Sequence, residues 1–401
     1  RKLQSTYSAR LWYQAASRNL PVPITSPTMY PSEKQHDESL RAMVTYGYLK
    51  GLTDLNFTAA FISDKLDYTN ELASVNSRNH SGSIILKSDI ERRINTILKV
   101  KLALNNELNI VNTNNYKGVK IRNIASADAT AEADITRWLA ARLLVREILQ
   151  DNRFLAPDFA VSSEIKIFRK KYYFIKACFS KNSKIPTLND MYWSPGGNPE
   201  LENEKGYSYE ITWDMTNNIS KSLSIKNDFT FFRNHLYDII QWHPGEFSYW
   251  EADNISNLKT AGIESGVDID YTSSTFRTRL KVGYSYTRAT NEGLSIENSM
   301  LTGKQLVYVP VNQIHALLRL SLWQFYSTIT TIYTGRRFLT ADNSQYLPQY
   351  SVSDLNLGLK LNTLHTSYDI GFIVENLFNT SYQNIAYYPM PGRSYLVSIV
   401  F

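Results

Sequence analysis

The feature that most constrains this chain is a two-residue alternation of apolar and polar side chains that recurs along it. In residues 354–362, leucine alternates with polar residues or glycine. The final segment, 394–401, alternates again and ends in an aromatic residue, Phe401. Successive side chains of a β-strand point to opposite faces, so each segment has one apolar face and one mixed or polar face. Helical periodicity is hard to find, and the sequence therefore predicts an all-β protein.

The alternating segments are long enough to cross a bilayer as tilted strands, which takes about 9–11 residues each. Strands of soluble sandwiches are typically about five or six residues long and carry their polar residues on the outer face. We therefore predict a transmembrane antiparallel β-barrel with about eighteen strands in this chain. Their predicted ranges are 7–18, 38–49, 53–62, 80–90, 96–112, 121–134, 138–149, 155–167, 171–180, 204–216, 220–233, 258–272, 275–288, 306–320, 322–334, 351–361, 366–376 and 393–401.

The connections between these strands alternate in length. Short turns are expected near 50–52, 169–171, 217–219, 273–274 and 363–365. Long loops are expected near 19–37, 63–79, 181–203, 234–257, 289–305, 335–350 and 377–392, so that all of them lie at one end of the sheet. Bacterial outer-membrane barrels have this asymmetry, with short turns in the periplasm and long loops outside the cell.

Composition agrees with a membrane barrel. Apolar residues make up 43% and the mean hydropathy is −0.32, and the chain has no run of about eighteen apolar residues, which excludes transmembrane helices. Its 27 tyrosines and 7 tryptophans suit the two membrane interfaces. The net charge of +6 does not indicate nucleic acid, because the basic residues are scattered. Arg277, Arg279 and Lys281 alternate along one predicted strand, and we expect them in a wet lumen. With no linker, residues 1–401 are expected to form a single barrel domain.

Patterns of catalytic chemistry are absent from the sequence, and we expect neither enzyme activity nor a cofactor. None of the six histidines falls in an H-E-x-x-H pattern, and no phosphate-binding loop or nucleophile elbow is present. The single cysteine, Cys178, excludes an intramolecular disulfide and a cysteine-based zinc site. Asp253-Asn254 and Asp342-Asn343 offer oxygen ligands of the kind calcium prefers, although such pairs are more often turn formers.

Three groups of residues have the spacing of known motifs. Residues 186–193 form a proline-led loop that ends in two aromatics, and residues 197–205 follow with Asn-Pro-acid-Leu and Glu-Lys. The second group is Asn254-Ile255 with Gly262-Ile263-Glu264, and the third is Glu375-Asn376-Leu377-Phe378-Asn379 with Pro391-Gly392-Arg393. Together they resemble the TonB-dependent outer-membrane receptors, and most closely the cobalamin-type members.

The resemblance implies the receptor and channel part of an active importer in the bacterial outer membrane. Its ligand would be large and scarce, with cobalamin or another corrinoid as the first expectation and a ferric siderophore or haem as the second. The implied partners are TonB, with ExbB and ExbD, and a surface-exposed substrate-binding lipoprotein. A passive porin or structural barrel without a plug is the alternative.

Receptors of this kind carry a plug domain and a TonB-contacting segment, and they close with about 22 strands. We find neither plug nor segment in the sequence, and about four strands fewer. The chain opens with Arg1-Lys2-Leu3, without an initiator methionine or signal peptide. We therefore expect a signal peptide, a plug and about four strands to be encoded before Arg1 or in a neighbouring chain.

Aromatic residues concentrated in the predicted long loops are the candidate ligand contacts, because rigid aromatic surfaces suit a bulky, partly apolar ligand. For each ring the alternative is anchoring at the membrane interface. Phe247 lies in the same predicted loop as three of them. The predicted contacts are Tyr192, Trp193, Trp242, Tyr249, Trp250 and Tyr388, with Arg393 as a polar contact in the lumen.

Overall fold

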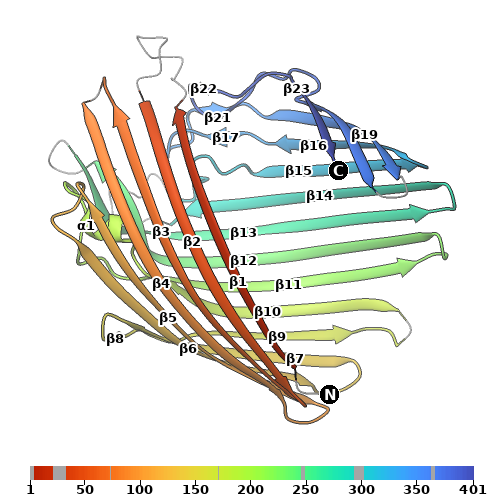
Figure 1. The fold of residues 1–401 in the computed structure, drawn as a ribbon, viewed down its shortest axis with the longest axis horizontal. Coiled ribbons are helices and arrows are strands. Elements are labelled where there is room, and N and C mark those ends of the chain that lie inside the picture. Colours follow the sequence, from red (N-terminus) through yellow and green to blue (C-terminus); the bar gives the residue numbers. More distant parts are fainter. Residues whose placement is uncertain are drawn as a thin grey trace. The chain divides into compact units, whose positions relative to one another are not determined.

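The computed structural model describes residues 4–20, 33–72, 74–169, 171–244, 249–292, 302–362 and 366–401. Lys170, Phe247, the predicted turn at 363–365 and parts of the predicted loops at 19–37, 63–79, 234–257 and 289–305 lie outside these residues. Most of the described residues lie in β-strands (Figure 1).

The first half of the chain contains β1 (Gln4–Asn19), β2 (Glu33–Lys50), β3 (Thr53–Asn70), β4 (Val75–Arg93), β5 (Leu98–Thr113), β6 (Lys120–Asp134), β7 (Leu139–Gln150), β8 (Arg153–Phe154), β9 (Asp158–Lys166), β10 (Tyr172–Lys184) and the helix α1 (Leu188–Tyr192). The second half contains β11 (Glu204–Asn218), β12 (Leu223–Pro244), β13 (Trp250–Thr272), β14 (Phe276–Asn291), β15 (Asn312–Leu322), β16 (Phe325–Thr334), β17 (Arg337–Phe338), β18 (Tyr346–Leu347), β19 (Tyr350–Asn362), β20 (Ser367–Glu375), β21 (Gln383–Ile385), β22 (Tyr388–Pro389) and β23 (Ser394–Val400).

Nineteen of these strands form one sheet, in which each long strand pairs with the long strand that follows it. The registers are antiparallel from β1 to β7 and from β13 to β23. β8 has only two residues, which leaves eighteen longer strands, as alternation predicted. In the part of the chain that the structure describes, no helix is long and apolar enough to cross a membrane.

The register separates an apolar face of the sheet from a polar one. Arg277 on β14 donates to Asp270 on β13 at 2.7 Å, and Arg279 donates to both oxygens of Asp268 at 3.0 and 2.7 Å. Lys281 lies 3.6 Å from Asp268. The basic row that the sequence predicted to be in a wet environment therefore pairs with carboxylates of the neighbouring strand, on the polar face.

Some predicted loops are strand, which corrects the sequence-based boundaries. β3 continues to Asn70 and β4 begins at Val75, so most of the predicted loop at 63–79 is paired backbone. β12 and β13 likewise extend into the predicted loop at 234–257. Polar side chains hold the extended ends together, for example Arg18 with Asp37 at 2.6 Å.

The predicted strand at 306–320 begins later, at Asn312. Before it, the Gln305 side chain binds backbone groups, accepting from the Ala289 N–H at 3.0 Å and donating to the Thr287 and Val309 carbonyls at 3.3 Å. Gln305 is buried, with 8% of its surface exposed. The Gln305 side chain thus hydrogen-bonds backbone groups that would be paired with a neighbouring strand in a regular ladder.

The chain forms two compact units. Unit 1 contains Arg1–Ser163, Cys178–Tyr207 and Leu236–Ser256, and unit 2 contains Glu164–Ala177, Ser208–His235 and Asn257–Phe401. In unit 1, four neighbouring strands carry a row of contacting rings, Phe159, Phe179, Tyr207 and Tyr237, whose successive centroids are 5.6, 6.5 and 6.1 Å apart. Such a row across strands is typical of the aromatic girdle at a membrane interface.

Candidate functional site

The helix α1 begins in the loop after β10 with a capping box. Thr187 is the N-cap, and its hydroxyl accepts from the backbone N–H of Asp190 at 3.1 Å. The Asp190 carboxylate accepts in return from the Thr187 backbone N–H at 2.9 Å and from its hydroxyl at 2.6 Å. Reciprocal bonds of this kind satisfy the free N–H groups at a helix start, so a short helix can form in a loop.

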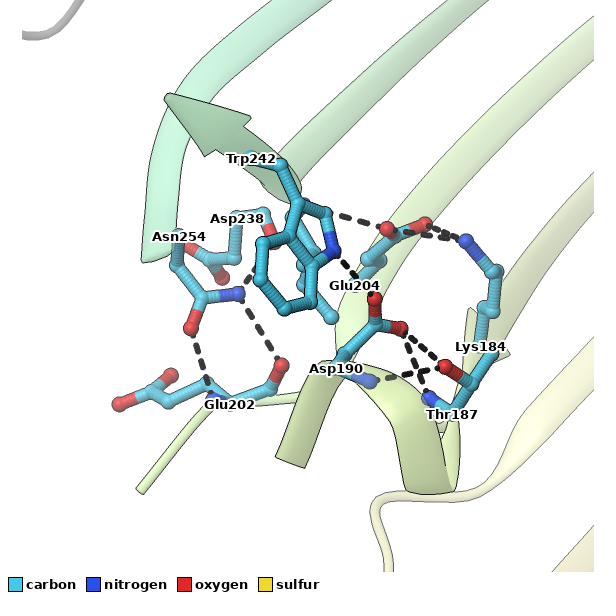
Figure 2. A network of polar contacts seen from close by, with 9 residues as sticks. Lys184, Thr187, Asp190, Glu202, Glu204, Asp238, Trp242 and Asn254 are labelled. Carbon is cyan, nitrogen blue, oxygen red and sulfur yellow. Dashed lines mark hydrogen bonds and ion pairs between the residues drawn. The ribbon is translucent and has the colours of Figure 1, made fainter. Parts of the chain in front are cut away.

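Asp190 also connects α1 to β12. The indole Nε1 of Trp242 donates to Asp190 Oδ1 at 3.0 Å, as Figure 2 shows. Burial alone would raise the pKa of the Asp190 carboxyl, but the hydrogen bonds from Thr187 and Trp242 outweigh it and lower this pKa below its ordinary value. The residue is therefore a carboxylate at neutral pH, and it joins two segments that are far apart in the sequence.

Two further polar groups fasten the strand ends around the loop (Figure 2). Glu204 is buried and accepts from Lys184 Nζ at 3.1 Å and from the Ile240 backbone N–H at 3.1 Å. The Asn254 amide accepts from the Glu202 N–H at 2.8 Å and donates to the Glu202 carbonyl at 3.1 Å. β10, β11, β12 and β13 are thus joined at the same end through side chains.

Two adjacent glycines allow close backbone approaches, Gly196 to β13 and Gly197 to the end of α1 in its own loop. A Cβ on Gly196 would lie 1.8 Å from the carbonyl oxygen of Trp250 and 3.3 Å from the Trp242 ring. Gly196 also has φ +106°, a conformation that L-residues with side chains rarely adopt. A Cβ on Gly197 would lie 2.6 Å from the backbone nitrogen of Trp193. The loop, Trp242 and Trp250 therefore meet at Gly196.

The other side of α1 packs on β6 and on the connection before it. The Tyr116 hydroxyl donates to the Asn189 side chain. Arg122, of which 7% is exposed, donates to the Pro186 carbonyl at 2.7 Å and to Met191 Sδ at 2.8 Å. A buried guanidinium is costly unless its N–H groups are bonded, so these contacts hold the helix in one position.

The structure brings together the predicted aromatic contacts of unit 1. The Tyr192 ring lies 6.4 Å from the Tyr116 ring and under Lys120 Nζ at 4.3 Å. Trp193 and Trp250 have 36% and 59% of their surface exposed. Trp242 is half-buried and its N–H is used by Asp190, so it braces the loop, while Tyr249 is half-buried beside Trp250.

Tyr388 and Arg393 belong to unit 2. Tyr388 is half-buried on β22, and Arg393 is exposed, with its backbone N–H donating to the Asn379 side chain at 2.9 Å. Asn376 joins the same two segments, because its amide donates to the Thr380 carbonyl at 2.9 Å and to the Pro391 carbonyl at 3.3 Å. The closing motifs seen in the sequence are thus bonded to each other.

The two pairs considered for calcium are both engaged in protein hydrogen bonds. Asp253 accepts from Asn198 at 3.0 Å and contacts His243 Nε2 at 2.9 Å. Asp342 accepts from the backbone N–H and hydroxyl of Ser344. A hydrogen bond with the Thr340 side chain, followed by these two bonds from Ser344, lowers the pKa of the Asp342 carboxyl to about 2. Within the described ranges, no group of three His, Cys, Asp or Glu residues could hold a metal ion.

Sequence reasoning had not identified the polar residues that position the aromatics. Asp190, Asn198 and Glu204 appeared in the sequence only as parts of motifs, and Asn254 as part of a motif and as a candidate calcium ligand. The Thr187-x-x-Asp190 spacing before an aromatic pair was the one local signal, since it is the pattern of a capping box. The longer-range pairs leave no signal in a single sequence.

Parts of this chain are similar in sequence to known transporters. A vitamin B12 transporter, BtuB, of Photobacterium profundum is 25% identical over 251 residues, which are 62% of this chain and 37% of that protein. The BtuB of Vibrio vulnificus is 39% identical over 83 residues, or 20% of this chain and 13% of that protein. The chain thus spans well under half the length of these curated relatives.

Solved structures show the same fold. The siderophore receptor PiuA of Acinetobacter baumannii superposes with a TM-score of 0.75 at 13% identity, over 98% of this chain and 71% of that one. The family model described as "TonB dependent receptor-like, beta-barrel" matches residues 173–377, about half of the chain. The chain belongs to this family of outer-membrane β-barrel receptors.

Proposed function

We propose that the protein is the receptor and channel for TonB-dependent uptake of cobalamin or another corrinoid. The observation that carries this proposal is the similarity to the two vitamin B12 transporters, at 25% and 39% identity. A ferric siderophore or haem is the second candidate, favoured by siderophore receptors among the structural neighbours, but at 13% identity such neighbours report the fold alone.

The proposed ligand contacts in unit 1 are Trp193 and Trp250, with Tyr192 and Tyr249 beside them. Exposed rings held on a braced loop lose little conformational entropy when they bind a large, partly apolar ligand. Trp242 supports them through Asp190. Tyr388 and Arg393 remain proposed contacts in unit 2.

Ligand affinity and uptake test the proposal separately. Purified receptor should bind cyanocobalamin, and cells that lack their own cobalamin receptor should accumulate it only when TonB, ExbB and ExbD are present. Binding without TonB-dependent accumulation would contradict the importer, and diffusion that needs no energy would favour a passive porin. Saturable binding of a ferric siderophore instead of cyanocobalamin would select the second candidate.

Single tryptophan variants test the site. Trp250→Ala should weaken ligand binding by about 2 kcal/mol, or roughly 30-fold, if the ring stacks on the ligand. Trp138→Ala is the control, because Trp138 is 55% exposed but lies in the β6–β7 turn, at the other end of the sheet. Unchanged affinity in Trp250→Ala and Trp193→Ala would remove this loop from the ligand site and favour docking of a substrate-binding lipoprotein there.

A further inference from the structure

Three short turns of unit 1 form a continuous rim at the end of the sheet opposite α1. They connect β2 to β3, β4 to β5 and β6 to β7 (Figure 1). Neighbouring turns are joined through the backbone, since the Arg93 N–H donates to the Leu52 carbonyl at 3.1 Å and the Asp134 N–H donates to the Ile97 carbonyl at 2.9 Å. In an outer-membrane barrel, short turns lie on the periplasmic side.

The rim exposes large apolar side chains where turns usually carry small polar residues. Each of the three turns has at least one large apolar residue, and about half or more of the surface of each such residue is exposed. They are Leu52 (60%), Ile94 (52%), Ile97 (49%), Ile135 (50%) and Trp138 (55%). A row of this kind on a single rim indicates a surface that meets an apolar phase.

Basic side chains lie next to these residues on the apolar face of the sheet. The register places Lys50 opposite Thr53, and Thr53 opposite Arg92, so the three form one row across β2, β3 and β4. Two strand spacings separate Lys50 from Arg92, about 10 Å at the backbone. Both side chains are exposed.

Carboxylates do not neutralise this row. The nearest carboxylates in the sequence are Asp54, which follows Thr53, and Glu91, which precedes Arg92. Because successive side chains of a strand point to opposite faces, both lie on the polar face, where Glu91 is 3.6 Å from Lys99. Among the described residues, no ion pair is found for Lys50 or Arg92. The row is thus a site of positive charge at the edge of an apolar surface.

A largely apolar hollow begins two residues further along the same face, where Leu55 pairs with Ile90, and Ile90 with Leu102. These three side chains line the hollow, together with Phe57, Leu104 and Val145. Glu147 lies two residues beyond Val145 on this face, at the end of the hollow away from the Lys50–Arg92 row. Such a surface is complementary to a hydrocarbon chain.

We propose that this rim binds an anionic phospholipid of the periplasmic leaflet. The phosphate lies between Lys50 and Arg92, an acyl chain occupies the hollow, and the exposed turn residues enter the headgroup region. Long basic side chains reach the phosphate level while their stems stay on apolar surface. Anionic lipids are preferred because each nearby Lys or Arg attracts a net negative headgroup more strongly than a zwitterionic one.

Lipid retention by the full chain tests this proposal. The chain is purified in detergent and titrated with phosphatidylglycerol or with phosphatidylcholine of the same acyl chains, and bound lipid is counted by native mass spectrometry. Phosphatidylglycerol should bind more tightly, and Lys50→Gln and Arg92→Gln should each weaken it about fivefold. Arg93→Gln is the matched control, because Arg93 adjoins Arg92 but faces the other side of β4.

Three results would overturn the proposal. One is equal binding of the two lipids, a second is an equal loss in Arg93→Gln, and the third is unchanged binding in the Lys50→Gln/Arg92→Gln double variant. Ala129→Phe, which fills the hollow, should reduce binding of both lipids. Heat-dependent mobility on gels verifies that each variant is folded, so that lost binding is not lost structure.

Discussion

Replacing Asp190 by alanine is expected to release the α1 loop while leaving the sheet folded. Its carboxylate accepts the Thr187 N–H and hydroxyl and the Trp242 indole N–H, so it is shared by the loop and β12. The strands are held separately by their backbone ladders and by Glu204. The substitution should therefore change local stability much more than global stability.

The magnitude follows from the bonds that are lost. A missing capping box costs about 1 kcal/mol, and a half-buried indole N–H left without its acceptor costs about 1–2 kcal/mol more. The sum of about 2–3 kcal/mol should raise the equilibrium constant for loop opening, and with it the amide exchange rate, roughly 30- to 150-fold. Trp242→Phe removes only the indole bond, and it should accelerate opening about fivefold.

Amide hydrogen exchange measures this opening. The probes are the N–H groups of Gly197 and Asn198, which donate to the Trp193 carbonyl at 2.7 Å and to the Asp190 carbonyl at 2.8 Å. Glu200→Gln is the control, because it removes an exposed carboxylate from the same loop. Wild-type exchange in Asp190→Ala, or an equal loss of global stability in urea, would refute the reasoning.

Three further results are expected. Acidification should open the loop, because the Asp190 carboxyl has a lowered pKa in the folded protein. Such a carboxylate stabilises the fold at pH values above its ordinary pKa, and this stabilisation is lost as the pH falls through the lowered value. The loop amides of the wild-type protein and of Asp190→Ala should therefore exchange at the same rate at acidic pH. Gly196→Ala should displace the loop and weaken ligand binding, whereas Gly51→Ala, also at positive φ but in open space in the β2–β3 turn, should not. Gly358→Ala should cost about 1–3 kcal/mol in urea unfolding, because its methyl would lie 2.0 Å from a tyrosine ring, whereas Gly82→Ala meets nothing within 4 Å.

Strand positions could be predicted from the sequence because alternation of apolar and polar residues marks each strand. The predicted strand at 351–361 is β19, Tyr350–Asn362, almost to the residue. Strand ends at the long-loop side could not be predicted. There both faces are polar or aromatic, and at Asp238 a positive φ of 57° interrupts the alternation although β12 continues.

Aromatic density in the sequence predicts a candidate loop but does not distinguish the surroundings of its rings. Trp242 and Trp250 are eight positions apart and look equivalent in the sequence, yet one is bonded to Asp190 and the other is 59% exposed. Asp190 and Trp242 are 52 positions apart, and only the fold of β10 to β13 brings them together. A pair of this kind cannot be predicted from local spacing.

The family motif at Asn376 has a structural explanation. The residue is 4% exposed, has φ +47°, accepts from the Thr380 N–H at 2.8 Å and donates to the Thr380 and Pro391 carbonyls. Asparagine is one of the few residues that tolerate this conformation and can also donate and accept through one side chain. It thereby fixes the loop between β20 and β23.

Two substitutions of Asn376 should therefore differ in how much they destabilise the protein. Asn376→Gly keeps the backbone conformation and loses three side-chain bonds, which should cost about 2–3 kcal/mol. Asn376→Asp keeps the acceptor but sets a carboxylate against two carbonyl oxygens, so its cost at neutral pH should be larger. Because that carboxyl would have a raised pKa when folded, the Asp variant should regain stability as pH falls, and the Gly variant should not. Urea unfolding at two pH values measures both, and negligible costs for the two variants at neutral pH would show that the side-chain bonds of Asn376 do not stabilise this loop.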